Sequence, residues 1–176
     1  MKQKAFKEQV FKLLFRAEFN TKEELLEQLP FYFDIGDLTV SEEDRQRIEK
    51  RLCEVLDRLP EIDAQVASVL RNWKPERIGK VELAVIRMTV YELQTDKVTP
   101  VGVIINDAVE LAKKFGQEGA GQFVNGVLAS FVPGQETKNG KKDVQGSGQE
   151  TKDGQNEVKG SGQEPEKEQE TKPGLD

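Results

Sequence analysis

The sequence predicts an all-α fold, with one helical domain over residues 1–133 and a disordered tail over residues 134–176. Apolar residues recur at helical spacing in seven segments, and no segment alternates as a strand does. Residues 81–93 are apolar at nine of 13 positions, so a helix there must be covered on most sides. The tail has no aromatic residue and holds eight of the 15 glycines, so it cannot bury enough apolar surface to fold.

The first predicted helix spans residues 4–19 and carries the one dense group of basic residues in an acidic chain. Its core face consists of Phe6, Val10, Leu13, Leu14 and Ala17. The other side carries Lys4, Lys7, Lys12 and Arg16, with Phe11 and Phe15 between some of them. Residues 1–16 hold five basic side chains against Glu8 alone. Such a helix is either a solvated amphipathic face or a surface for an RNA backbone with an aromatic ring for base stacking.

Capping residues and prolines place the next three helices. Thr21 and Glu24 form a capping box for the second helix, which we expect to end before Pro30. An apolar loop is then expected to pack on the core through Phe31, Tyr32, Phe33 and Ile35. Ser41 caps the third helix, with Asp44 at its third helical position. Pro60 is expected to break the chain before a fourth helix that reaches Trp73.

Helices over residues 101–115 and 120–132 are expected to cover the central segment 81–93. Pro100 suits the start of the first of them, and Gly116 follows a basic last turn, as helix ends commonly do.

The last predicted helix contains two unusual neighbours, Asn125 and Gly126. Gly126 lies in mid-helix, where glycine costs about 1 kcal/mol relative to alanine, so we expect a neighbouring helix to approach closely there. Asn125 beside it would need hydrogen-bond partners if buried. We expect Asn125 to join an internal polar network in which Arg87 pairs with Glu110.

Composition excludes several classes of function. The chain has no histidine, so the commonest general base and metal ligand is missing, and no phosphate-binding loop follows a strand. We therefore predict no enzymatic activity, no metal and no cofactor. The single Cys53 cannot form an intramolecular disulfide, and no apolar run is long enough to span a membrane, so we expect a cytoplasmic protein.

Several strings in the second half of the domain resemble one family. They are GKVE at 79–82, AVIR at 84–87, VYEL at 90–93, INDAVELAKKFG at 105–116 and FVNGVL at 123–128. Together they resemble the NusB family of bacterial transcription antitermination factors. The resemblance is ordered over residues 79–128, in register but weaker in the first helix, and absent from the tail.

The resemblance implies a compact seven-helix fold in two three-helix subdomains and a role without catalysis. It also implies a partner, the ribosomal protein NusE, with which family members bind single-stranded boxA-type RNA in the leaders of ribosomal RNA. The pair acts within the RNA polymerase antitermination complex and helps the polymerase resist termination. No membrane and no small-molecule substrate is implied.

The resemblance also carries over to individual residues. The arginine-rich arm of the family corresponds here to Lys2, Lys4 and Lys7, with Lys12 one face further along and Phe15 at a position that is commonly aromatic. The turn before the last helix belongs to the RNA surface of the family, so Gln122 and Phe123 are further candidate RNA contacts. Glu82 matches a position that faces the ribosomal-protein partner.

Two departures leave alternatives open. Lysine lacks the planar fork with which arginine binds phosphate, and residues 119–122 are Gly-Ala-Gly-Gln where charged side chains are expected. The chain could therefore be a NusB-like protein-interaction adaptor with little RNA binding of its own. A NusB-like domain of a ribosomal-RNA methyltransferase is a third possibility, disfavoured because only the tail follows. With a net charge of −6, the chain should bind RNA far better when a basic partner is docked.

Overall fold

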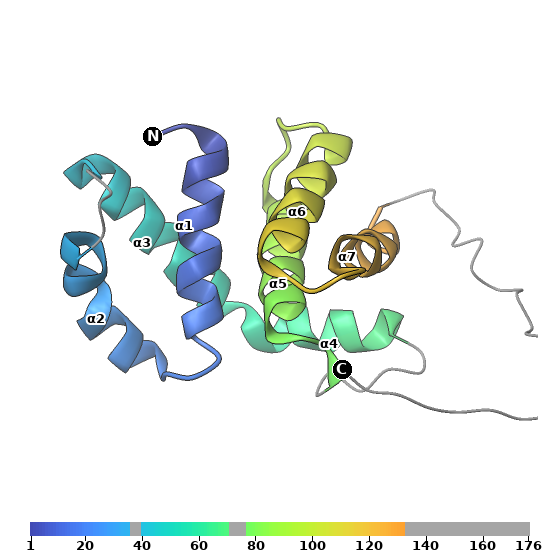
Figure 1. Ribbon diagram of the computed structural model, residues 1–176, viewed down its shortest axis with the longest axis horizontal. Helices are drawn as coiled ribbons and strands as arrows, with labels where there is room; N and C mark the ends of the chain where they lie inside the picture. Colours follow the sequence, from blue (N-terminus) through green and yellow to red (C-terminus); the bar gives the residue numbers. More distant parts are fainter. Residues whose placement is uncertain (36–39, 71–76, 133–176) are drawn as a thin grey trace, which may run out of the picture. The chain divides into compact units, whose positions relative to one another are not determined.

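A computed structural model describes residues 1–35, 40–70 and 77–132, all of which belong to one compact unit. These residues form helices and connecting turns without a strand, so the predicted all-α fold is confirmed (Figure 1). The helices are α1 (Gln3–Arg16), α2 (Lys22–Ile35), α3 (Glu42–Asp57), α4 (Leu59–Val69), α5 (Lys80–Thr95), α6 (Val101–Phe115) and α7 (Ala120–Ala129). No helix in this part of the chain is long and apolar enough to cross a bilayer. Trp73 and the predicted tail lie outside the described residues.

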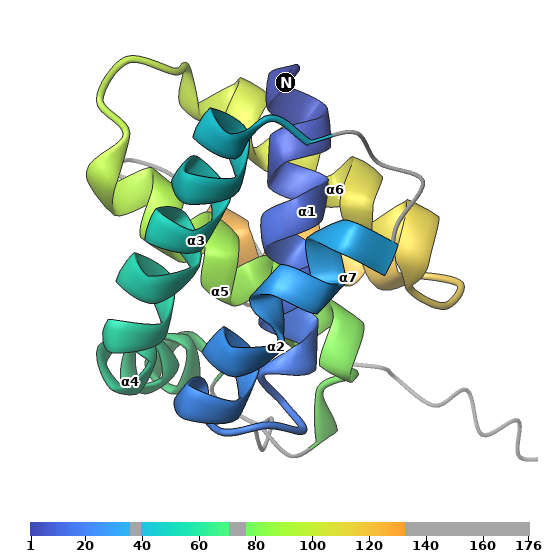
Figure 2. The ribbon, with the colours of Figure 1, turned by 90° about the vertical axis from the view of Figure 1, so that its left-hand side faces the viewer.

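Helix α5 is the central element of the fold. It contacts α1, α3, α4, α6 and α7, and α1 is held between α3 and α5 (Figures 1 and 2). Val85 and Met88 of α5 are 0% and 4% exposed. The prediction that residues 81–93 form an interior helix covered by the two following helices is therefore confirmed.

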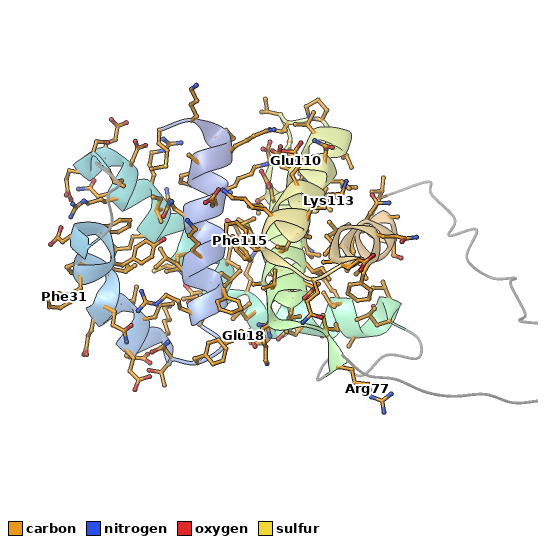
Figure 3. All side chains as sticks on the ribbon, in the orientation of Figure 1. Glu18, Phe31, Arg77, Glu110, Lys113 and Phe115 are labelled. Carbon is orange, nitrogen blue, oxygen red and sulfur yellow. The ribbon has the colours of Figure 1, made fainter. Side chains whose placement is uncertain are left out.

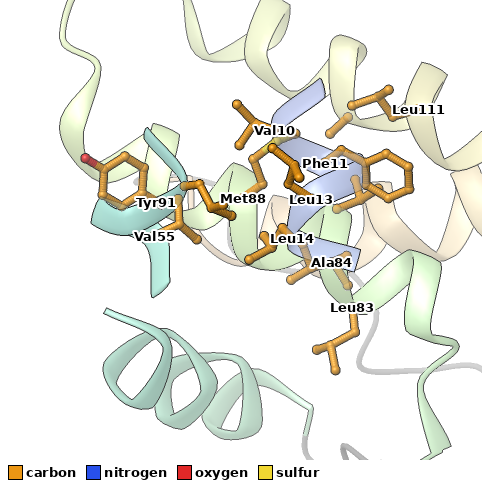
Figure 4. Close-up of a cluster of buried hydrophobic side chains, with 14 of the residues drawn as sticks. Val10, Phe11, Leu13, Leu14, Val55, Leu83, Ala84, Met88, Tyr91 and Leu111 are labelled. Atoms are coloured by element: carbon orange, nitrogen blue, oxygen red, sulfur yellow. The ribbon is translucent and has the colours of Figure 1, made fainter. Parts of the chain in front are cut away.

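The core packs α1 against α5. Side chains of α1 such as Val10, Leu13 and Leu14 interlock with Ala84 and Met88 of α5 (Figure 4). Because α1 has buried neighbours on two sides, its apolar face is wider than a single stripe. Phe11 accordingly lies in the core at 3% exposure, which corrects its expected place among the outward-facing lysines.

Helix α2 is longer than expected, because Pro30 lies inside it rather than beyond its end. Proline in a helix interior costs about 3 kcal/mol. Continuing the helix, however, places Leu25, Leu29 and Phe33 on one face at a spacing of four residues, and all three are buried. The expected apolar loop is thus the last turn of α2, in which Phe31 is exposed and the Tyr32 hydroxyl donates to Gln9 Oε1 at 2.6 Å.

The predicted N-terminal caps are confirmed. The Glu24 amide donates to Thr21 Oγ1 at 3.2 Å, and the Thr21 amide donates to Glu24 Oε2 at 2.8 Å. The Asp44 amide donates to Ser41 Oγ at 3.3 Å. Pro60, expected to break the chain, instead stands in the first turn of α4, where its missing N–H removes no helical hydrogen bond.

The close approach expected at Gly126 occurs at Gly121 instead. A Cβ atom on Gly126 would meet nothing within 4 Å, whereas one on Gly121 would lie 2.8 Å from Lys113 Cγ of α6. Asn125 is exposed, so it belongs to no internal network. Gly119, with a φ of 84°, makes the tight turn into α7, a conformation that favours glycine.

Candidate nucleic-acid interface

The predicted RNA-binding lysines of α1 meet α6 and α5 along a line of ion pairs, here called the α1–α6 seam. The seam comprises four lysines and four acidic residues, namely Lys4, Lys7, Lys12, Lys114, Glu8, Glu92, Asp107 and Glu110. A pocket of about 190 Å³ opens on it, lined by six of these residues and Leu111. Figure 3 shows the α6 side of the seam, with Glu110 and Phe115 labelled.

Lys7 is not available to RNA, which corrects its expected role. It is 4% exposed, and its ammonium lies 2.8 Å from both Glu92 Oε1 and Asp107 Oδ2. Burial lowers the pKa of Lys7, but the hydrogen bonds to Asp107 and Glu92 outweigh it and raise the pKa above its ordinary value. Lys7 is therefore a structural cation that joins α1 to α5 and α6.

Lys4 lies at the outer edge of the seam and remains accessible. Its ammonium is 2.8 Å from Glu110 Oε2, and both side chains are more than half exposed. The hydrogen bond to Glu110 raises the pKa of Lys4, and the same contact lowers the pKa of Glu110. Exposed pairs of this kind are weak and screened by salt, so a phosphate can compete for Lys4.

Glu8 bridges two further lysines from two different helices. Its Oε1 lies 2.8 Å from Lys12 Nζ of α1, and its Oε2 lies 2.7 Å from Lys114 Nζ of α6. Partial burial raises the pKa of Glu8, but the hydrogen bonds from Lys114 and Lys12 outweigh it and lower the pKa below its ordinary value. Glu8 is therefore held as a carboxylate at neutral pH.

The expected dense cationic patch is neutralised in the folded chain. The four lysines of the seam face four carboxylates, so its net charge is zero. Lys2 is exposed and takes part in none of the ion pairs of the described residues. The sequence count of basic residues near the N-terminus missed this because three of the four carboxylates come from residues 92–110.

A row of phenylalanine rings runs beside the seam. The ring centroids of Phe115 and Phe11 are 5.1 Å apart, those of Phe11 and Phe15 are 6.5 Å apart, and those of Phe15 and Phe19 are 5.5 Å apart. Lys12 Nζ and Lys114 Nζ lie 5.7 and 5.1 Å from the centroid of Phe115. Phe15 is half-buried and Phe19 is exposed, so the row leads from the core to solvent.

The other predicted contacts lie on α5 and α7 and are not among the ion-paired residues of the seam. Gln122 is exposed and Phe123 is half-buried against the core, both in the first turns of α7. Along the horizontal axis of Figure 1, α6 lies between α1 and α7, the helix that carries both residues. Glu82 is half-buried in the first turn of α5, and its carboxylate lies beside Gly79 and Gly116.

Arg87 does not pair with Glu110, which corrects the expected network. Its Nε and Nη2 donate to the two carboxylate oxygens of Asp63 on α4, each at 2.7 Å, and its Nη1 donates to Glu18. Glu18 also accepts from Lys80 at 2.8 Å. Arg87 therefore ties α5 to α4 and to the turn after α1.

Lys114 and Phe115 are not among the residues predicted from the sequence, because a basic last turn that ends in an apolar residue is ordinary for a helix. The pairing of Lys12 with Phe115 could be found only from the fold, since the two residues are 103 positions apart.

Comparisons with known proteins agree with this architecture. The NusB family profile matches residues 4–133. The transcription antitermination protein NusB of Agathobacter rectalis is 44% identical over 133 residues, which cover 75% of this chain and 100% of that protein. The structure of T. maritima NusB is similar with a TM-score of 0.65 at 30% identity, covering 74% of this chain and 90% of that one.

A structure of the antitermination factors NusB and NusE in complex with dsRNA is also similar. Its matching chain has a TM-score of 0.60 at 26% identity, covering 73% of this chain and 94% of that one. The extent of the family match and the identity to curated relatives confirm the resemblance noted in the sequence, and the chain belongs to the NusB family.

Proposed function

We propose that this chain is a transcription antitermination factor that binds RNA together with the ribosomal protein NusE. The RNA is boxA-type single-stranded RNA of ribosomal RNA leaders, and the complex helps RNA polymerase resist termination. Family membership supports the general role, and the related structure that contains NusB, NusE and dsRNA supports the choice of partners. The protein acts in the cytoplasm, and its role is binding rather than catalysis.

The observation that carries the proposal is the placement of Lys12 and Lys114 around Phe115. These lysines come from two helices, and both ammonium groups lie within 6 Å of one aromatic ring. Single-stranded RNA is bound by cations that follow its phosphates and by aromatic rings that stack on its bases. Lys2, Lys4, Phe15 and the exposed Phe19 extend this surface along α1.

The charges of the chain argue for a partnered mechanism. The seam carries no net charge and the whole chain carries −6, so long-range attraction of RNA is absent. A basic ribosomal protein docked on an acidic surface, with Glu82 as one contact, supplies the missing positive charge. Gln122 and Phe123 on α7 are proposed as peripheral RNA contacts.

A titration of boxA-type RNA into the chain, with and without NusE, tests the proposal. We expect RNA to bind the complex at least tenfold more tightly than the chain alone. The logarithm of affinity should fall with the logarithm of salt concentration by about 0.7 for each phosphate neutralised. Equal affinity with and without NusE, or affinity independent of salt, would show that the proposal is wrong. A double-stranded version of the same RNA tests the preference for single strands.

The neutral seam favours a second candidate function, a protein-interaction adaptor. In that case NusE binds the chain, but RNA affinity of the complex equals that of NusE alone. The same titration therefore separates the two functions, with isolated NusE as the reference.

A further inference from the structure

Glu8 is the most buried member of the bridge that it forms with Lys12 and Lys114. The exposed fraction of its side chain is 21%, compared with 36% for Lys12 and 58% for Lys114. Each of its carboxylate oxygens accepts from one lysine, at 2.8 and 2.7 Å. The carboxylate is thus the least exposed group of the bridge, and the two ammonium groups are more accessible to solvent.

This bridge has the chemistry of a phosphate-binding site that is already occupied. A phosphodiester also offers two non-bridging oxygens, and it prefers the same short charged hydrogen bonds from ammonium groups. Both ammonium groups lie over the ring of Phe115, at 5.7 and 5.1 Å from its centroid. An RNA phosphate that reaches these lysines must compete with Glu8.

We propose that Glu8 is an internal competitor of RNA, whose carboxylate occupies Lys12 and Lys114 until an RNA phosphate displaces it. This inference rests on the proposed function, because it assigns a tuning residue within the same RNA surface. The displacement breaks two partly exposed ion pairs and leaves a carboxylate near the bound RNA. Glu8 therefore lowers the affinity for every RNA and favours RNA that is delivered at high local concentration by a bound partner.

The test measures RNA affinity and its salt dependence for Glu8→Gln in complex with NusE. We expect RNA to bind this variant about three- to tenfold more tightly, because RNA binding no longer has to break two weak, partly exposed ion pairs. The salt slope should change little, because Lys12 and Lys114 neutralise RNA phosphates in both complexes once Glu8 is displaced. The matched control is Glu49→Gln, an exposed glutamate of α3, which lies on the opposite side of α1 from α6 (Figures 1 and 2). It makes the same change in net charge.

A second variant separates competition from simple charge. In a chain that carries both Lys12→Met and Lys114→Met, adding Glu8→Gln should change RNA affinity no more than Glu49→Gln does. If Glu8→Gln matches Glu49→Gln in the otherwise unchanged chain, Glu8 is no competitor, although the proposed function stands. If the unchanged complex shows no RNA binding beyond that of NusE alone, the proposed function itself fails. Thermal unfolding of each variant confirms that the folded chain is compared throughout.

Discussion

Replacing Lys7 with methionine is expected to destabilise the folded chain by about 3–5 kcal/mol, because the buried carboxylates of Glu92 and Asp107 lose the ammonium group that pairs with both of them. Methionine keeps a similar unbranched side chain, so the change removes charge with little loss of packing volume. The expected fall in melting temperature is on the order of 10 °C. Chemical denaturation followed by circular dichroism measures the free energy of unfolding, and thermal unfolding measures the melting temperature.

Lys4→Met is the matched control for this prediction. It removes the same charge from the same helix, but the pair between Lys4 and Glu110 is exposed, so the melting temperature should change little. If Lys7→Met were no more destabilising than Lys4→Met, Lys7 would not be the structural cation described above.

The pH dependence of the Lys7 contribution follows from its raised pKa. A cation whose pKa is higher in the folded state stabilises that state below the unfolded pKa, and this stability is lost as pH rises through the folded pKa. The difference in stability between the unchanged chain and Lys7→Met should therefore persist through neutral pH. Above neutral pH it should shrink only in strongly alkaline solution.

Replacing Arg87 with methionine is expected to cost about 2–4 kcal/mol. The change removes a bidentate pair with Asp63 and leaves Glu18, whose side chain is 8% exposed, with Lys80 as its remaining cation. Asp63 is 39% exposed and can be rehydrated, so the loss should be smaller than for Lys7→Met. The free energy of unfolding from denaturant titration is the measurement.

Two companion variants test the geometry around Arg87. Arg87→Lys keeps the charge but loses the planar fork, so its stability should lie between those of the unchanged chain and Arg87→Met. Glu110→Gln should add to Arg87→Met without coupling, because the two side chains belong to different ion-pair groups. An Arg87→Met chain that unfolds at an unchanged denaturant concentration would refute this network.

The burial of Lys7 could have been predicted from the sequence more fully than it was. Lys7 stands three, four and seven residues before Val10, Phe11 and Leu14, which places it on the apolar side of α1. Its positive charge, however, favours a position on the RNA-facing surface. The acidic partners Glu92 and Asp107, by contrast, lie 85 and 100 positions away, and helical periodicity carries no information about such distant contacts.

The fold was more predictable than the site, and the wrong predictions about the fold concern packing between helices. Caps at Ser41 and Thr21 follow short-range hydrogen-bonding rules, so they were predicted correctly. The predicted end of the second helix before Pro30 is wrong, because burial of Leu29 and Phe33 outweighs the local cost of proline in a helix. No neighbouring atom explains the glycine at position 126. The close approach at Gly121 to Lys113 depends on how α7 packs on α6, which the sequence alone does not show.

We propose that RNA binds the exposed lysines of the α1–α6 seam and the phenylalanine rings beside it, while Lys7 only supports them. The most direct test is the salt dependence of RNA binding by the NusE complex, with and without the paired changes Lys12→Met and Lys114→Met. We expect the double variant to bind RNA more weakly, with a salt slope flatter by about 1.4 and little change in melting temperature. An unchanged slope and affinity in a folded double variant would contradict it.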